Sequence, residues 1–205
     1  ITADLIRTLA GIPVVPTALM VTNFINDTTS PRLTSFQLDY NTGILTLRFS
    51  EAINPATFNV SGVQLQGTSD IVNAGSSFLK LTGGNLSTSS NNVVYSITLT
   101  PSDLNRLKQL TPLGISSLTT YVSVTPSSAR DFSGNVLANE YLPGSALQLS
   151  GPPVPDVIPP TLTGFDFDLN AGRIVVSFSE TINSSTFVVS SFTIQDAAQA
   201  TRSYR

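Results

Sequence analysis

The stretch FQLDYNTGILTLRFSEAIN (Phe36 to Asn54) decides how this chain folds, and the chain contains it twice. The second copy, FDFDLNAGRIVVSFSETIN, runs from Phe165 to Asn183. In both copies, apolar residues alternate with polar ones on each side of an Asn-x-Gly turn, as in two strands that each turn one face to a core. The glycine supplies the positive φ that closes a short hairpin. The sequence therefore predicts the same β-hairpin at two places.

The duplication extends beyond this hairpin. When the sequence is slid on itself by 129 residues, Asp156 lies over Asp27, and nearly half of the positions from Asp27 to Gln66 are identical. A weaker match with one gap relates Ala3–Asn23 to Arg130–Gly151. Such a period indicates tandem copies of one structural unit. The predicted parts are the C-terminal end of a preceding repeat at 1–26, a complete repeat at 27–155 and the N-terminal part of a following repeat at 156–205.

Short apolar stretches, separated by Gly-, Ser- and Asn-rich segments such as LTGGNLSTSSNN, predict further strands in the central repeat. They lie at Val60–Leu65, Phe78–Leu81, Val93–Leu99, Tyr121–Val124 and Ala146–Leu149. One segment, at about 101–110, has leucines at helical spacing after TPSD. Thr100 can cap this helix, Pro101 suits its first position and Asp103 completes a capping box. The pattern predicts an antiparallel β-sandwich with one short helix per repeat.

The motif order P-x-L…F-x-x-D…G-x-L-T-L-x-F-S-E-x-I-N…T-F, followed by A-x-D-x-x-G-N, resembles the bacterial immunoglobulin-like repeats of S-layer proteins and adhesins. It is also similar to repeats in large microbial extracellular fibre proteins. The residues that carry the match are Pro31, Leu33, Phe36, Phe49, Ser50, Glu51, Thr57, Ala129, Asp131, Gly134 and Asn135. The resemblance implies an all-β chain of tandem immunoglobulin-like sandwiches that acts as a spacer or structural module in a surface-exposed protein.

Composition excludes several classes of function. Charged residues make up 11% of the 205-residue chain, the net charge is −3 and the lysines are Lys80 and Lys108 alone, which argues against nucleic-acid binding. Cysteine and histidine are absent, which excludes disulfides, Cys/His zinc sites and His-dependent catalytic triads. No apolar run reaches the roughly 18 residues of a membrane span. Without a signal-peptide pattern at Ile1, we expect the chain to be a window cut from a longer protein. Its low lysine content and its high content of Ser, Thr and Asn favour an exported, surface-displayed protein.

A glutamate ends the second strand of the hairpin in both copies, as Glu51 and as Glu180. Paired with Asp131, Glu51 could serve glycoside hydrolysis, but that chemistry needs an oriented substrate cleft, which the sequence does not indicate. The favoured interpretation is that Glu51 caps a turn or binds backbone amides. A calcium site is the alternative, with Glu51, Asp131 and Asn135 as candidate ligands and Asp27 or Asp156 beside them. We predict no catalytic and no cofactor-binding residues.

Four sequons make glycosylation candidates of Asn26, Asn59, Asn85 and Asn183, and Asn85 is favoured because we place it in a Ser-rich loop. The two lysines are expected to be solvated surface residues rather than partners in a Lys–Asn cross-link. GPPVPDVIPP (Gly151 to Pro160) is predicted to be a stiff linker between repeats.

The sequence thus favours a non-enzymatic structural repeat module of a large extracellular or cell-surface protein, forming an elongated fibre, hair or coat. Neighbouring repeats and other copies in the fibre are the expected partners, and glycans are a further candidate. An adhesin stalk or a glycan- or protein-binding module is the alternative, and it would be marked by exposed Trp or Tyr platforms. The stiff linker predicts that Asp27 and Asp156 lie at opposite ends of the central sandwich, as in a rod.

Overall fold

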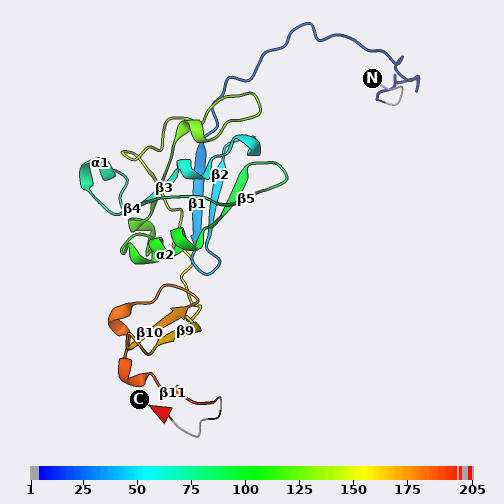
Figure 1. Ribbon diagram of the computed structural model, residues 1–205. Helices are drawn as coiled ribbons and strands as arrows, with labels where there is room; N and C mark the ends of the chain where they lie inside the picture. Colours follow the sequence, from blue (N-terminus) through cyan, green and yellow to red (C-terminus); the bar gives the residue numbers. More distant parts are fainter. Residues whose placement is uncertain (1–4, 198, 200–202, 205) are drawn as a thin grey trace.

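The central part of the chain is a sandwich of two antiparallel sheets (Figure 1). The computed structural model describes residues 5–197, 199 and 203–204. In spatial order, the first sheet contains β1 (Leu33–Asp39), β2 (Ile44–Phe49), β6 (Val94–Leu99) and β5 (Gly84–Thr88). The second sheet contains β4 (Phe78–Lys80), β3 (Val63–Gln66), β7 (Tyr121–Val124) and β8 (Leu147–Gln148). The predicted all-β class is confirmed at this level.

The core lies between the two sheets, and the alternation in the sequence builds it. Leu45, Leu47 and Phe49 of β2 are buried on one face, and Leu65 of β3 and Val122 of β7 are buried on the facing sheet. Burial of a side chain of this size contributes about 1.5–3 kcal/mol. The pairing of apolar faces is therefore the main source of stability of the sandwich.

An aromatic cluster closes one end of this core. Phe49 packs edge-on against Phe58 and Tyr95, at ring-centroid distances of 6.1 and 5.7 Å, and Phe58 stacks on Tyr95 at 5.0 Å. The buried Tyr95 hydroxyl donates a 2.7 Å hydrogen bond to the carbonyl oxygen of Ile53. The segment FSEAIN (Phe49 to Asn54) thus contributes the Phe49 ring to this cluster, and it also contributes the Ile53 carbonyl oxygen that accepts from the Tyr95 hydroxyl group.

Helix α2 (Pro101–Gln109) matches the predicted helix, and Thr100 caps it by accepting from the Asp103 amide at 3.1 Å. The predicted capping box is only half formed. The buried Asp103 carboxylate does not return to the start of the helix but accepts from the Thr82 amide and hydroxyl, at 2.9 and 3.1 Å. These bonds tie α2 to the segment after β4. The prediction of a single helix per repeat was wrong: α1 (Ile71–Ala74) also forms, capped by Asp70.

Two stretches differ from the predicted strands. Val60–Gly62 is the 3₁₀ helix η2, because the Asn59 side chain accepts from the Ser61 amide at 3.0 Å and turns the chain before β3. Strand β5 lies in the Ser-rich stretch that we predicted to be a loop, and it pairs with β6 at the edge of the first sheet. Further 3₁₀ turns are η1 (Pro55–Thr57), η3 (Ser117–Thr119) and η4 (Pro126–Ser128).

The second copy of the repeated stretch, Phe165 to Asn183, forms the same hairpin with the same register. Phe36 pairs with Leu47 in the first hairpin, and Phe165 pairs with Val176 in the second. The second hairpin and the elements after it are β9 (Leu162–Asp168), β10 (Arg173–Phe178), η5 (Ser184–Thr186), η6 (Val189–Ser191), β11 (Ile194–Gln195) and β12 (Ser203–Tyr204). The environments differ, since Phe36 is 1% exposed and Phe165 is 57% exposed.

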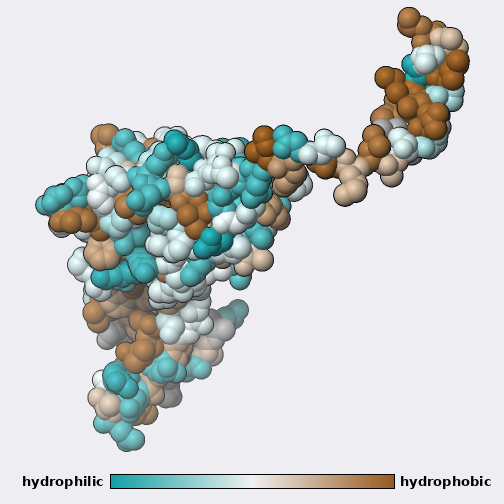
Figure 2. Space-filling view, turned by 90° about the horizontal axis from the view of Figure 1, so that it is seen from above, coloured by the Kyte–Doolittle hydropathy of each residue, from teal (hydrophilic) through white to brown (hydrophobic). Residues whose placement is uncertain are grey.

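The chain before the sandwich is extended. Its apolar side chains, among them Leu9, Met20 and Phe24, are exposed. Figure 2 shows brown, apolar atoms on an arm that leaves the main body. No helix of the described residues is long and apolar enough to cross a membrane. The arm leaves one end of the sandwich, and the β9–β10 hairpin lies beyond the other end, next to α2 (Figure 1).

Candidate functional site

Three carboxylates meet where the chain enters the central sandwich. Asp27 precedes β1, Glu51 follows β2, and Asp131 pairs with Ile53 in an isolated antiparallel bridge. Each of the three offers a carboxylate oxygen, and these atoms lie within 4.8 Å of one another. Burial, with the neighbouring charges of Asp27 and Asp131, raises the pKa of Glu51. The sandwich therefore concentrates negative charge at this end.

The Asp131 carboxylate is already engaged in building a turn. It accepts from the Ser133 and Asn135 amides at 2.9 and 2.7 Å and from the Asn135 side-chain amide at 2.8 Å. Burial tends to raise the pKa of Asp131, but these hydrogen bonds prevail and lower it. Asn135 Nδ2 also donates to the Asp27 carbonyl oxygen at 3.1 Å, so the turn holds the start of the repeat in place.

The calcium candidates fit this arrangement only in part. The structure brings Glu51 and Asp131 together with Asp27, the junction residue that the sequence offered as a further calcium ligand. Asn135 takes part as a hydrogen-bond donor to Asp131 and Asp27. Ca²⁺ takes six to eight oxygen ligands, and both Asp131 oxygens already accept hydrogen bonds from protein groups. The free carboxylate oxygens of this cluster are therefore fewer than the six to eight ligands that calcium takes.

A second charged cluster lies at the opposite end of the sandwich, in the last turn of α2. The Lys108 ammonium is 2.7 Å from Asp156 Oδ2 and 2.5 Å from Glu180 Oε2. Burial tends to lower the pKa of Lys108, but the hydrogen bonds and charges of the two carboxylates raise it, and the hydrogen bond from Lys108 lowers the pKa of Asp156. The prediction that Lys108 is a solvated surface lysine was wrong, because its side chain is only 16% exposed.

This ion cluster joins two copies of the repeated sequence. Lys108 belongs to the central sandwich, whereas Asp156 and Glu180 flank the first strands of the segment that follows it. By the internal repeat, Asp156 is the counterpart of Asp27 and Glu180 is the counterpart of Glu51. The sequence marked both glutamates, but the lysine between the carboxylates could not be found from it, because α2 and the second hairpin become neighbours only in the fold.

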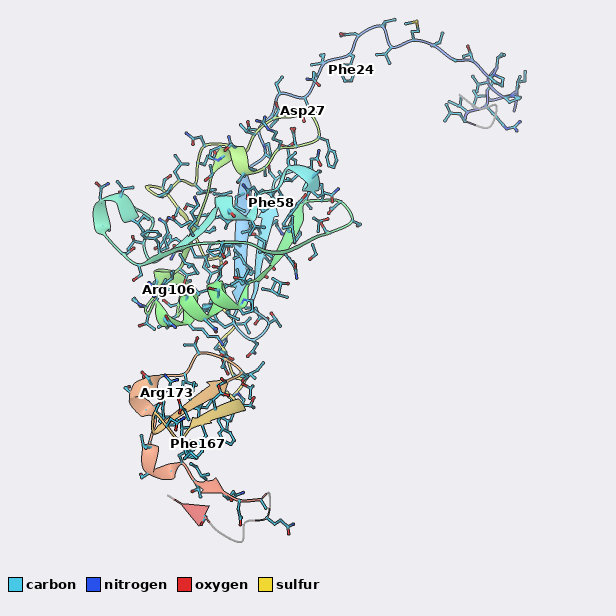
Figure 3. The ribbon with its side chains drawn as sticks, in the orientation of Figure 1. Phe24, Asp27, Phe58, Arg106, Phe167 and Arg173 are labelled. Atoms are coloured by element: carbon cyan, nitrogen blue, oxygen red, sulfur yellow. The ribbon has the colours of Figure 1, made fainter. Side chains whose placement is uncertain are left out.

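The proline-rich segment between the copies is bound to the sandwich. Val154 donates to the Leu38 carbonyl oxygen at 2.9 Å and accepts from the Tyr40 amide at 3.0 Å, and the Val157 amide donates to Asn41 Oδ1 at 2.8 Å. Together with Lys108, these contacts fix the start of the second hairpin beside α2. Figure 3 shows Asp27 at one end of the sandwich, Arg106 of α2 at the other, and Arg173 and Phe167 beyond it.

The four glycosylation candidates all lie at exposed positions, Asn26, Asn59, Asn85 and Asn183. Asn85 is in strand β5, which corrects its predicted place in a loop, and it lies on an edge strand. Asn59 and Asn183 are helix caps whose Oδ1 atoms accept from the Ser61 and Ser185 amides. Exposure makes the side chains accessible, and whether any of them carries a glycan stays a prediction.

Comparisons with known proteins give a weak structural likeness. No family model and no curated protein matches the chain. The crystal structure of the S-layer protein rSbsC(31-844) is similar over 84% of this chain, with 12% identity and a TM-score of 0.38. Domains 1–6 of the surface layer protein SbsC are similar over 73% of it, with 14% identity and a TM-score of 0.40. The match spans 21% and 18% of those chains, and TM-scores of this size carry no argument about the fold or function of this one.

Proposed function

We propose that this chain is a non-enzymatic structural repeat module of a large extracellular or cell-surface protein. Its units are sandwiches of immunoglobulin-like type, joined end to end into an elongated fibre, hair or coat. Neighbouring repeats of the same chain, and other copies in the assembly, are its partners. The observation that carries this proposal is the ion cluster of Lys108, Asp156 and Glu180, which holds the start of one copy of the repeat on the end of another.

The second hairpin supports the proposal through its exposed face. Phe165 and Phe167 are exposed in β9, whereas their counterparts Phe36 and Leu38 are buried under the second sheet of the central sandwich. Local contacts of the two copies also agree, since Phe178 packs edge-on against Phe187 as Phe49 does against Phe58. The copied segment has the local structure of the start of a sandwich, and its apolar face is the one that a second sheet covers in the central unit.

The tyrosines favour a structural role over glycan binding. A glycan-binding face uses exposed aromatic platforms, and the chain contains no tryptophan. Of the tyrosines whose side chains the structure describes, Tyr40 and Tyr95 are buried and Tyr121 and Tyr141 are half-buried. None of these four tyrosines is fully exposed, as the aromatic platform of an adhesin tip would have to be.

Small-angle X-ray scattering of two chains tests the proposal. The first is the chain itself, and the second is the same chain with 27–155 duplicated in tandem. End-to-end units predict that the maximum dimension grows by roughly 35–40 Å, about one unit diameter, estimated from the size of a compact domain of that length. A matched control replaces 151–160 with a Gly/Ser segment of equal length, and it should give a broader distribution of distances. A maximum dimension that stays constant on duplication would refute the rod.

A further inference from the structure

The Lys108 cluster shows what the repeated carboxylate pair does in one of its two copies. Asp156 and Glu180 together hold one ammonium group, which comes from the end of the preceding sandwich. The other copy of the pair, Asp27 and Glu51, lies at the entry of the central sandwich. Among the described residues, no lysine or arginine forms an ion pair with Asp27 or Glu51.

We propose that Asp27 and Glu51 form the receptor for the ammonium group of a lysine carried, like Lys108, on the last helical turn of a preceding unit. This inference rests on the proposed function, because it needs a unit of the same kind before this one. The same contact would then recur at every junction, because each sandwich has a carboxylate pair at its entry end and a lysine at its exit end.

The backbone positions the first carboxylate of both pairs in the same way. Asp27 Oδ1 accepts from the amide of Thr29 at 2.9 Å, and Asp156 Oδ1 accepts from the amide of Ile158 at 3.1 Å. Each aspartate therefore closes the same local turn with one oxygen. In Asp156, the second oxygen binds Lys108, so the corresponding Oδ2 atom of Asp27 is the one offered to a lysine.

The second carboxylate of each pair is fixed by the same strand-end contacts. Ser50 donates from its amide to the Arg32 carbonyl oxygen at 2.8 Å, and Ser179 donates to the Thr161 carbonyl oxygen at 2.9 Å. The hydroxyl of each serine accepts from the same partner residue at 2.9 Å. The residue after this serine is a glutamate in both copies. Glu51 and Glu180 therefore occupy equivalent positions at the ends of their hairpins.

The charge at the entry end suits a cation of this kind. Asp131 adds a third carboxylate to the pair, and the raised pKa of Glu51 reflects burial and two unneutralised neighbours. An ammonium group needs only a few acceptor oxygens, whereas a calcium ion needs six to eight. Because Asp131 is committed to its turn, the free oxygens are mainly those of Asp27 and Glu51, the two that match the pair that binds Lys108.

Zero-length carbodiimide cross-linking, read by mass spectrometry of peptides, tests the inference. In the natural chain, we expect links from Lys108 to Asp156 and Glu180. In the chain with 27–155 duplicated, Lys108 of the first unit should also form links to Asp27 and Glu51 of the second, in comparable yield. K108M in the first unit alone should abolish the new links, and K80M, a change at the other lysine, should leave all of them.

Three outcomes separate the inference from the function beneath it. If the duplicated chain is elongated in scattering but gives no link to Asp27 or Glu51, the inference is overturned and the end-to-end function stands. If it is compact and Lys108 forms no link at either junction, both fail. Saturable binding of CaCl₂ to the natural chain, lost in E51Q and kept in E180Q, would also overturn the inference, because it would assign the entry site to calcium.

Discussion

Replacing Gly114 with alanine is expected to destabilise the central sandwich by about 2–5 kcal/mol, through backbone strain and overpacking together. Gly114 has a φ of +83°, a conformation that L side chains rarely adopt. A Cβ atom added there would lie 1.6 Å from the Tyr40 hydroxyl oxygen and 2.7 Å from Cζ of the same ring. Neither distance is tolerable, so the ring or the loop has to move.

The magnitude follows from these two terms. Left-handed backbone adds roughly 1–2 kcal/mol for a residue with a Cβ atom. Overpacking a filled core adds typically 1–3 kcal/mol. The Tyr40 ring cannot shift freely, because it is buried and its hydroxyl lies 3.4 Å from the Leu113 carbonyl oxygen, its acceptor. Burial also raises the pKa of Tyr40 to about 12, as expected for a phenol held away from water.

Urea unfolding followed by circular dichroism measures the effect, and Gly134 is the matched control. Gly134 has a φ of +94°, but an added Cβ atom would meet no other atom within 4 Å. G134A should therefore show the backbone term alone, about 1–2 kcal/mol. The steric term should shrink in a Y40F background, where the clashing oxygen is absent. If G114A and G134A lower the unfolding free energy equally, the assigned contact between Gly114 and Tyr40 is wrong.

Three further predictions concern the junction, the core and the surface. K108M should lower stability by roughly 1 kcal/mol at pH 7, since its ion pairs are only partly exposed, and urea midpoints should show the loss. The lowered pKa of Asp156 stabilises the folded chain above about pH 4, and the raised pKa of Lys108 stabilises it below about pH 10. The difference in stability between the natural chain and K108M should therefore shrink as the pH falls below about 4. Y95F should destabilise by about 1–3 kcal/mol because the buried Ile53 carbonyl oxygen loses its 2.7 Å donor, and equal unfolding curves would contradict this. Secretion from a eukaryotic host should place a glycan on Asn85, and glycopeptide mapping that finds the site bare would reject it.

The periodic parts of the sequence predicted the periodic parts of the fold. The hairpin of β1 and β2 forms where alternation and Gly43 place it, and φ at Gly43 is +65°. Helix α2 forms where Thr100 and Pro101 start it. Both depend on interactions between residues close in sequence, which a local pattern contains. The strands at Tyr121–Val124 and in 93–99 were found for the same reason.

The missed features left no periodic pattern in the sequence. Strand β5 has no clear alternation, because it lies at a sheet edge and most of its side chains are exposed, so only pairing with β6 defines it. Asp103 looked like a capping residue, but Thr82 of a different segment takes its carboxylate. The entry cluster followed partly from sequence, since Glu51 and Asp131 were candidates. That Lys108 meets Glu180 is visible only when α2 and the second hairpin are packed together.

The proline-rich segment affects both the open edge of β1 and the way in which the chain would respond to a pulling force. Pro152, Pro153 and Pro155 have no amide hydrogen to donate, so within this stretch Val154 alone can pair with the edge of β1. Its bonds to Leu38 and Tyr40 occupy that edge, and the prolines beside it block continued strand pairing, which protects the sheet against edge-to-edge association. Val154 pairs with β1 in parallel, and the chain enters and leaves the sandwich at opposite ends. A pull along the chain would therefore load these hydrogen bonds in shear, together with the Lys108 cluster, before it reached the core. In the proposed end-to-end array, the segment between the units would thus also be the segment that has to hold under load.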